Sequence, residues 1–431
     1  MEILPERTFP MEGFKLHVVK TGKYKTNALV FKMKAPLNEK EATLRALLPH
    51  VLQSSSALYP TTTKLRAYLD ELYGAVLYAE LAKKGDYHII TFFLEIANEK
   101  FLTDSSPLLR KGFEFLNEIL LNPFTDGNGF DEATVEKEKR TLKQRIQSTY
   151  DDKMRYSNFR LIEEMYKGEA YAINVNGRQE DVDGITPAGL YEYYQKALEE
   201  DELDLYVIGD VEEEEAKALA GGLFRFQPRK PIYVEKSTSS FKRDEVKVVK
   251  EPQDVKQGKL NIGYRTNIFY GDKDYHALQV FNGIFGGFSH SKLFINVREK
   301  ASLAYYAASR LESHKGLMMV MSGIDLKNYD QAVGIIAEQM DAMKNGDFTE
   351  AEMEQTKAVI VNQLLETIDT NRGIVEVLYH NVAAGKEIPF SNWIEGMKKT
   401  TREEVVDVAQ KISLDTIYFL TGKEAAEHGE N

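Results

Sequence analysis

The sequence predicts an α+β protein made of two homologous domains, each an antiparallel sheet with helices packed on it. Three observations support this prediction: the length of the chain, an internal repeat, and a common order of elements in the two halves. At 431 residues the chain exceeds the size at which a single hydrophobic core keeps growing, so we expect at least two domains. Apolar residues make up 43% of the sequence, which is ample for two cores.

The internal repeat becomes visible when the sequence is shifted against itself. A shift of 228 positions aligns two pairs of blocks, and a shift of 218 positions aligns a third pair. The aligned blocks are 63–78 with 291–306, 88–96 with 316–324, and 130–146 with 348–364. The change of offset fits an insertion around NPFTDGNG in the first half. Three blocks in the same order indicate a duplicated unit.

Each half then reads as the same series of elements. Leucine and valine recur at intervals of three and four residues in the first helix, which is typical of one buried helix face. Strands that follow one another directly favour antiparallel pairing, with the helices on one face of the sheet. The expected pairs of elements are helices at 43–54 and 275–287, helices at 62–73 and 290–300, strands at 75–82 and 303–311, strands at 87–97 and 316–324, helices at 131–149 and 349–369, and strands at 204–211 and 416–422.

The junction between the halves is polar, charged and contains proline. It predicts a linker at 227–255, between an N-terminal domain at 1–226 and a C-terminal domain at 256–431.

Composition excludes several classes of function. The net charge of −12 argues against nucleic acid as a partner, because binding phosphates requires clustered Lys and Arg. The absence of cysteine excludes disulfides, thiolate metal sites and a cysteine nucleophile. The N-terminus has no signal pattern, and no apolar run approaches the length of a membrane span. We therefore expect a cytoplasmic protein with no membrane partner.

Sequence motifs for catalysis are scarce. No two of the eight histidines lie three or four residues apart, the spacing at which one helix supplies two zinc ligands. There is also no G-x-S-x-G elbow, Walker loop or G-x-G-x-x-G turn.

Several longer segments nevertheless resemble one family. VREKASLAYY, from Val297 to Tyr306, is similar to the second-domain signature R-E-K-x-G-L-A-Y of the pitrilysin family of inverted-zincin metallopeptidases. VEKEKRTLKQRIQSTYDD (135–152) resembles the family's helix that brings the third zinc ligand, and 173–198 resembles its I-T-x-x-x-L-x-x-Y-Y segment. The resemblance covers essentially the whole chain. It implies the processing-peptidase-like fold in a clamshell arrangement.

The zinc site of the family is degenerate in this chain. The family motif is H-x-x-E-H on the first apolar helix. Aligning the turn that follows places Ala46, Pro49 and His50 on the H, E and H positions. An alternative alignment starts from His50 and gives Gln53 and Ser54 for the Glu and the second His. On the later helix, the family's two glutamates correspond to Glu138 and Arg145, and an arginine repels zinc instead of binding it. Either alignment leaves one ligand and no general base, so we expect no metal in this chain.

The second-domain signature is better preserved. In the family, an Arg and a Tyr seven residues apart reach the bound peptide or the reacting carbonyl, and Arg298 and Tyr305 occupy those positions here. A guanidinium and a phenol both suit a carbonyl that gains negative charge. Ser302 departs from the pattern, because the family has glycine there.

The resemblance therefore implies a peptidase-family subunit that is inactive alone. We expect it to bind substrate in a heterodimer with a homologous chain that carries H-x-x-E-H and the zinc, around an unfolded peptide. A homodimer remains possible. The alternative function is a peptide-binding or structural scaffold without a role in hydrolysis.

Overall fold

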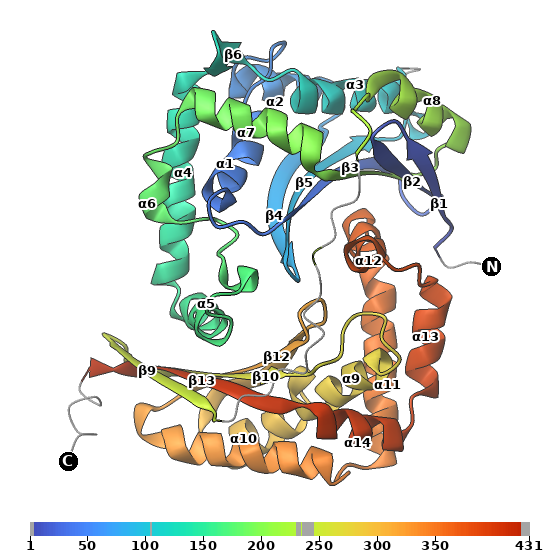
Figure 1. The fold of residues 1–431 in the computed structure, drawn as a ribbon. Helices are drawn as coiled ribbons and strands as arrows, with labels where there is room; N and C mark the ends of the chain where they lie inside the picture. The colour runs from blue at the N-terminus through green and yellow to red at the C-terminus, as the bar shows by residue number, and fades with distance from the viewer. Residues whose placement is uncertain (1–3, 104–105, 230–233, 235–244, 424–431) are drawn as a thin grey trace. The chain divides into compact units, whose positions relative to one another are not determined.

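The computed structural model describes residues 4–103, 106–229, 234 and 245–423. The chain divides into two compact units, which are treated separately below (Figure 1). Unit 1 comprises Met1–Ser148 and Ile173–Glu235, and unit 2 comprises Thr149–Ala172 and Lys236–Asn431. Among the described residues, no helix combines the length and the apolar character needed to span a membrane.

Unit 1 is built on a six-stranded sheet with the strand order β1-β2-β8-β3-β5-β4. Alternate residues of its strands, such as Leu29, Phe31 and Met33, join the helices α1, α3, α7 and α8 in one hydrophobic core. Its elements are β1 (Glu6–Met11), β2 (Phe14–Lys20), β3 (Thr26–Pro36), α1 (Ala42–Leu52), α2 (Thr62–Glu71), β4 (Val76–Lys84), β5 (Tyr87–Ala97), η1 (Glu99–Phe101), α3 (Leu108–Leu121), β6 (Thr125–Asp126), β7 (Gly129–Phe130), α4 (Glu132–Asp151), α6 (Gln179–Val182), α7 (Pro187–Glu200), β8 (Glu202–Gly209) and α8 (Glu213–Leu223).

Unit 2 is built on a five-stranded sheet with the order β11-β12-β10-β13-β9. Its main core joins this sheet to α9, α10, α11 and α14. Its elements are α5 (Lys153–Met165), η2 (Ala170–Ala172), β9 (Lys247–Gln253), β10 (Gly258–Arg265), α9 (Tyr275–Asn282), η3 (Gly283–Gly287), η4 (Phe294–Lys300), β11 (Ala304–Glu312), β12 (Leu317–Ile324), η5 (Leu326–Asn328), α10 (Tyr329–Lys344), α11 (Glu350–Thr367), α12 (Asn371–Ala384), α13 (Phe390–Lys399), α14 (Arg402–Lys411) and β13 (Ser413–Gly422).

The α+β architecture with two similar domains is thus confirmed, and the repeat is visible in the element bounds. Strands β4 and β11 begin at Val76 and Ala304 and end at Lys84 and Glu312, which is the offset of 228 seen in the sequence. Helices α4 and α11 begin at Glu132 and Glu350, which is the offset of 218.

The prediction of purely antiparallel sheets needs one correction in each unit. Strand β2 pairs with β8 in parallel, and β9 pairs with β13 in parallel. Both pairs join strands that lie far apart in the sequence, and the helices between them supply the crossover that a parallel pair requires. The other pairs in the two main sheets are antiparallel.

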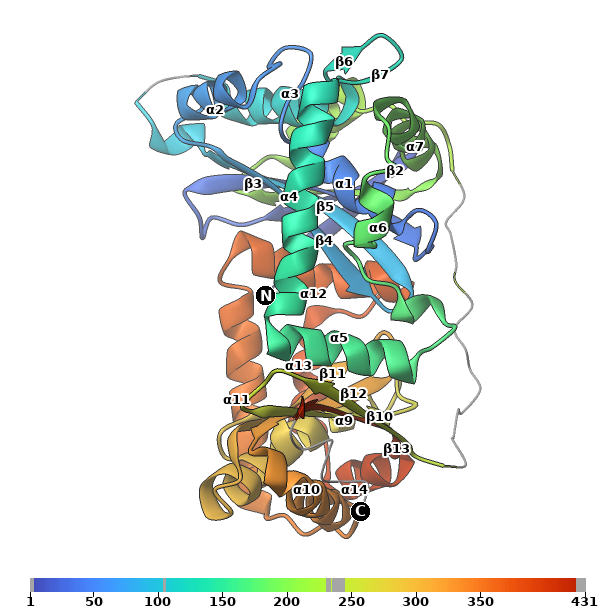
Figure 2. The same ribbon diagram turned by 90° about the vertical axis from the view of Figure 1, so that its left-hand side faces the viewer.

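The division of the chain also differs from the predicted domains. Part of the predicted linker (227–255) forms β9, and its residues 230–233 and 235–244 lie outside the described residues. The segment 149–172, expected in the N-terminal domain, clusters with unit 2. There α5 packs against β10 and β13 (Figure 1 and Figure 2).

Two side chains of α5, Tyr156 and Arg160, bind Glu251 of β9, which Tyr418 of β13 also contacts. Tyr156 Oη donates to Glu251 Oε1 at 2.6 Å, Arg160 Nε donates to Glu251 Oε2 at 3.0 Å, and Tyr418 Oη donates to the same oxygen at 2.9 Å. Tyr156 and Leu161 also form an apolar cluster with Met319 and Tyr418. Helix α5 therefore covers a face of the sheet on which the sequence pattern predicts no helix.

Candidate functional site

Helix α1 carries the positions that correspond to the zinc ligands. Its apolar face is fully engaged, and Ala46 is completely buried in the core of unit 1. Pro49 lies inside the helix, eighth of its eleven residues, where it has no N–H to offer the carbonyl of Arg45. No carboxylate stands where the family has its general base. The helix has kept its packing role and lacks the side chains for metal-assisted hydrolysis.

His50 is held in a neutral form. His50 is only 6% exposed. Its burial is the larger cause and the charge of Arg145 the smaller one, and together they lower the pKa of the imidazole to about 4. Gln53 Oε1 accepts from the backbone N–H of Ala79 at 2.8 Å, so its amide nitrogen faces His50 Nδ1 at 3.1 Å. Because a backbone N–H can only donate, this arrangement fixes the Gln53 amide and makes Nδ1 the acceptor. The proton of the neutral imidazole is therefore on Nε2.

Helix α4, which carries the later ligand positions, lies beside His50 and the residues that follow α1. Glu138 and Arg145 lie two turns apart, on one side of the helix. Ser54 Oγ donates to Glu138 Oε1 at 2.7 Å, and Lys137 Nζ lies 3.2 Å from that oxygen. Burial lowers the pKa of Arg145, and Glu138 acts in the opposite direction.

The ligand positions are thus brought together, but their chemistry does not fit zinc. The charge of Arg145 acts on His50, and both alignments place these two residues at ligand positions. A guanidinium beside a single histidine repels a divalent cation, and Ala46 and Pro49 offer no donor atom. Across the described ranges, no group of three or more His, Cys, Asp or Glu side chains is placed to hold a metal ion. The residues at these positions therefore do not fit a zinc ion.

The outer edge of the sheet lies next to this helix. Strand β4 is the last strand of its sheet and pairs with β5 in antiparallel register, with Ala79 opposite Phe92. The N–H of Ala79 points away from β5, because Gln53 accepts its hydrogen bond. Gln53 consequently caps one outward-facing backbone donor of an edge that could otherwise pair with another strand. Sequence reasoning considered Gln53 only as a possible substitute for the glutamate.

Arg298 lies on a π-helical turn in unit 2, η4. Val297 beside it is fully buried and anchors the turn in the core. The Arg298 guanidinium lies over the ring of Phe294, 4.6 Å from its centroid, and Nε is 3.6 Å from Glu299 Oε1. Its side chain is 42% exposed. Turns with this wide hydrogen-bonding pattern are frequent at functional sites.

Tyr305 lies at an irregularity of strand β11. The pairing with β12 shifts register between Ala304 and Tyr306, so Tyr305 is the extra residue of a β-bulge. Tyr305 is 75% exposed. Bulges often redirect a side chain next to a binding site. The geometry presents the phenol to solvent at the edge of the sheet.

Ser302 stands where the family has glycine, and the backbone conformation at this position explains the family's preference. Its φ angle is +53°, in the left-handed region that glycine adopts without cost. The family glycine at this position thus has a conformational reason, and this chain makes the same turn with a serine. The N–H of Leu303 donates to the carbonyl of Val297 and closes the turn before Tyr305.

Comparison with known proteins bears on identity. The sequence profile described as "Peptidase M16 inactive domain" matches residues 184–360. The "Probable inactive metalloprotease YmfF" of Bacillus subtilis is 57% identical over 414 residues, covering 96% of this chain and 97% of that protein.

The chain belongs to the peptidase M16 family.

This confirms the family predicted from the sequence, and the chain is a homologue of M16 metalloproteases. A conserved protein from Enterococcus faecalis V583 has the same fold, with a TM-score of 0.88 and 36% identity over 97% of this chain and 99% of that one. The "Uncharacterized zinc protease YmfH" of Bacillus subtilis is 31% identical over 156 residues, which is 36% of this chain and 34% of that protein. The roles of Arg298 and Tyr305 in this M16 homologue remain predictions.

Proposed function

We propose that this M16 homologue is the non-catalytic, substrate-binding subunit of a heterodimeric peptidase. A homologous chain with an intact H-x-x-E-H motif would supply the zinc and the general base, and the substrate would be an unfolded peptide. The observation that carries the proposal is the contrast between the two motifs. The zinc positions hold Ala46, Pro49 and Arg145, whereas Tyr305 is exposed on a bulge directly after the turn that bears Arg298.

The physical role of the pair follows from its donors. The Arg298 guanidinium offers charge-assisted hydrogen bonds, and the Tyr305 hydroxyl offers one more. Both suit a carbonyl oxygen that becomes negative during hydrolysis. The strained turn at Ser302 supports this role, because such conformations persist where the surrounding structure requires them.

Peptide recognition would use an exposed sheet edge. An extended peptide can add to β4 through main-chain hydrogen bonds, which tolerate many sequences. Gln53 must release the N–H of Ala79 before a peptide can pair there. The affinity for peptide should therefore rise when Gln53 is replaced by alanine.

The test is a reconstitution assay. The purified chain is mixed with a zinc-bearing M16 homologue from the same cell, and cleavage of an unstructured fluorogenic peptide is measured. We expect activity only from the mixture, and a loss of at least about a hundredfold for the double variant Arg298→Ala/Tyr305→Ala. The variant Tyr305→Phe keeps the aromatic ring and removes the hydroxyl, so it measures the contribution of the hydroxyl alone.

A matched control removes the same types of residue elsewhere in unit 2. Arg310 is exposed on β11, and Tyr150 is exposed near the end of α4. The variant Arg310→Ala/Tyr150→Ala should retain activity. Full activity of Arg298→Ala/Tyr305→Ala in the mixture would refute the shared site, and peptide binding without any cleavage would favour the scaffold function. Stoichiometric zinc in the chain purified alone would overturn the proposal.

A further inference from the structure

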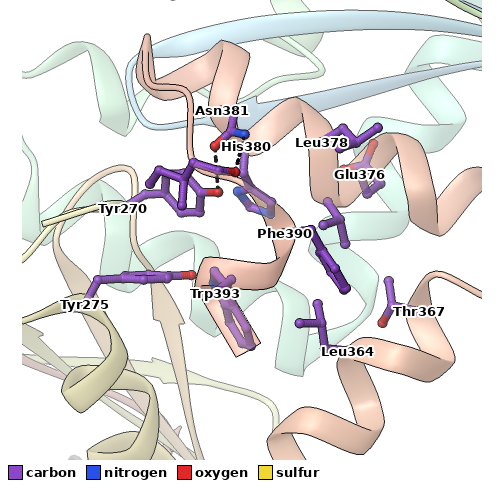
Figure 3. A pocket seen from close by; sticks show the side chains of 12 residues that line it. Tyr270, Tyr275, Leu364, Thr367, Glu376, Leu378, His380, Asn381, Phe390 and Trp393 are labelled. Carbon is purple, nitrogen blue, oxygen red and sulfur yellow. Dashed lines mark hydrogen bonds between the residues drawn. The ribbon is translucent and has the colours of Figure 1, made fainter. Parts of the chain in front are cut away.

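Unit 2 contains a cavity that the proposed function does not use. Its volume is about 250 Å³, and twelve residues line it, from α9 and the segment before it, from α11, and from α12, α13 and the loop between them (Figure 3). Aromatic side chains form much of the wall, namely Tyr270, Tyr275, His380, Phe390 and Trp393. This volume accommodates one side chain or a small ligand, somewhat below the usual size of drug-binding pockets.

The rings meet at steep angles. The centroids of Tyr270 and Tyr275 are 5.1 Å apart with an interplanar angle of 66°, and those of Tyr275 and Trp393 are 6.4 Å apart at 65°. His380 stacks on Tyr270 at 5.3 Å. Inclined aromatic rings around one cavity also form the aromatic cages that hold ammonium groups.

Hydrogen bonds hold this arrangement in place. The Tyr270 hydroxyl donates to Asn381 Oδ1 at 3.0 Å, and Asn381 Nδ2 donates to the carbonyl of Ile388 at 2.9 Å. His380 Nδ1 and His314 Nε2 are 2.7 Å apart. Trp393 packs edge to face against Tyr275, with the ring centroids 6.4 Å apart. A cavity fixed in this way needs little reorganisation on binding.

The charge of the lining has one sign. Glu376 is the one carboxylate among the twelve lining residues, and no lysine or arginine is among them. The π faces of the aromatic rings are also negative. Both features favour a cation over an anion as the ligand.

We propose that this cavity binds an organic cation, an alkylated ammonium or a guanidinium group. Two sources share this chemistry: a free small cation, and the side chain of an arginine or lysine in a peptide. The proposal does not depend on the shared peptidase site, because its residues include neither Arg298 nor Tyr305.

Trp393 makes the test direct, since it is the one tryptophan of the chain. Its fluorescence is followed while the full chain is titrated with choline, with N-methylguanidinium, and with 3,3-dimethylbutan-1-ol as the neutral isostere of choline. We expect a saturable change with both cations and an affinity for choline at least about tenfold above that for the alcohol. Equal affinity for the alcohol, or no saturable change with either cation, would overturn the proposal.

Variants locate the site and separate the two sources. Glu376→Gln should weaken the binding of choline several-fold and leave the weak binding of the alcohol unchanged. The control Glu338→Gln removes an exposed carboxylate from α10 and should change neither. A tetrapeptide with blocked ends that contains one arginine is compared with N-methylguanidinium. Tighter binding of the peptide identifies a peptide side chain as the ligand. Tighter binding of the free cation identifies a small molecule. An unchanged choline affinity in both Glu376→Gln and Phe390→Leu would refute this location.

Discussion

The neutral state of His50 gives a quantitative test of the degenerate zinc site. Burial and the charge of Arg145 lower its pKa to about 4, against about 6.5 for an exposed histidine. In a titration of the histidine ring signals by NMR, the His50 resonance should therefore stay neutral down to about pH 4; the buried His88, whose pKa is lowered to about 3, should give a second such resonance. The variant His50→Gln identifies the His50 resonance by its disappearance. A pKa near 6.5 would refute the burial argument.

The same shift has a consequence for stability. Between pH 6.5 and about 4, the unfolded state binds a proton at His50 that the folded state does not bind. The stability is therefore complete above pH 6.5 and falls as the pH drops towards 4. The interval corresponds to about 3 kcal/mol of unfolding free energy. Urea unfolding of wild type and His50→Gln over this range should show that the variant loses about 3 kcal/mol less.

The contribution of Arg145 can be separated from burial. In Arg145→Gln, we expect the pKa of His50 to rise but to stay below 6.5, because burial is the larger cause. Arg140→Gln is the matched control, since Arg140 is exposed on the same helix. If Arg145→Gln left the pKa of His50 unchanged, the two side chains would not be neighbours, and the assignment of Arg145 to the third ligand position would fail.

Three further predictions concern other parts of the chain. Ser302→Val should destabilise the chain by about 1–2 kcal/mol in urea unfolding, and Ser302→Gly should not, because a β-branched residue tolerates positive φ poorly. For His17, burial alone would lower the pKa, but Asp204 and Glu6 raise it to about 9. Its contribution of about 3 kcal/mol is therefore complete below pH 6.5 and lost as the pH rises through 9, and His17→Gln should flatten that loss. Glu251→Ala removes four hydrogen bonds, two from α5 and two from the sheet, and should accelerate hydrogen exchange in α5, with a cost of about 2 kcal/mol.

The fold was largely predictable because its signals are local and repeated. The apolar spacing of α1, the paired runs of β4 and β5, and their copies 228 residues later all follow from burial of one face. The parallel pairs were not predictable, since β2 and β8 are almost 190 residues apart and their pairing depends on the completed core. The position of α5 was missed for a similar reason, because its contacts with Glu251 and Tyr418 are far apart in the sequence.

The residues of the candidate site could be predicted from the sequence, but their geometry could not. The exchange of Gly for Ser at position 302 was visible, yet its meaning required the φ angle of +53°. The role of Gln53 had a weak signal, its spacing of three residues from His50, which places both on one helix face. The second hydrogen bond of Gln53 comes from a backbone donor on another element, the N–H of Ala79 on β4, and no local pattern indicates it.

The loss of the metal site is shared among several residues, which leads to a last prediction. Ala46→His alone would restore two histidines at the spacing of a zinc helix, but it would place a large side chain at a fully buried position and leave the charge of Arg145. We expect it to destabilise unit 1 by about 1–3 kcal/mol and to bind no zinc. The variant Ala46→His/Arg145→Glu removes the repulsion and offers a third ligand, so it should bind zinc measurably by metal analysis after dialysis. It should still not cleave peptide, because Pro49 leaves no general base. Zinc binding by Ala46→His alone would show that the charge of Arg145 does not prevent a metal ion from binding at this site.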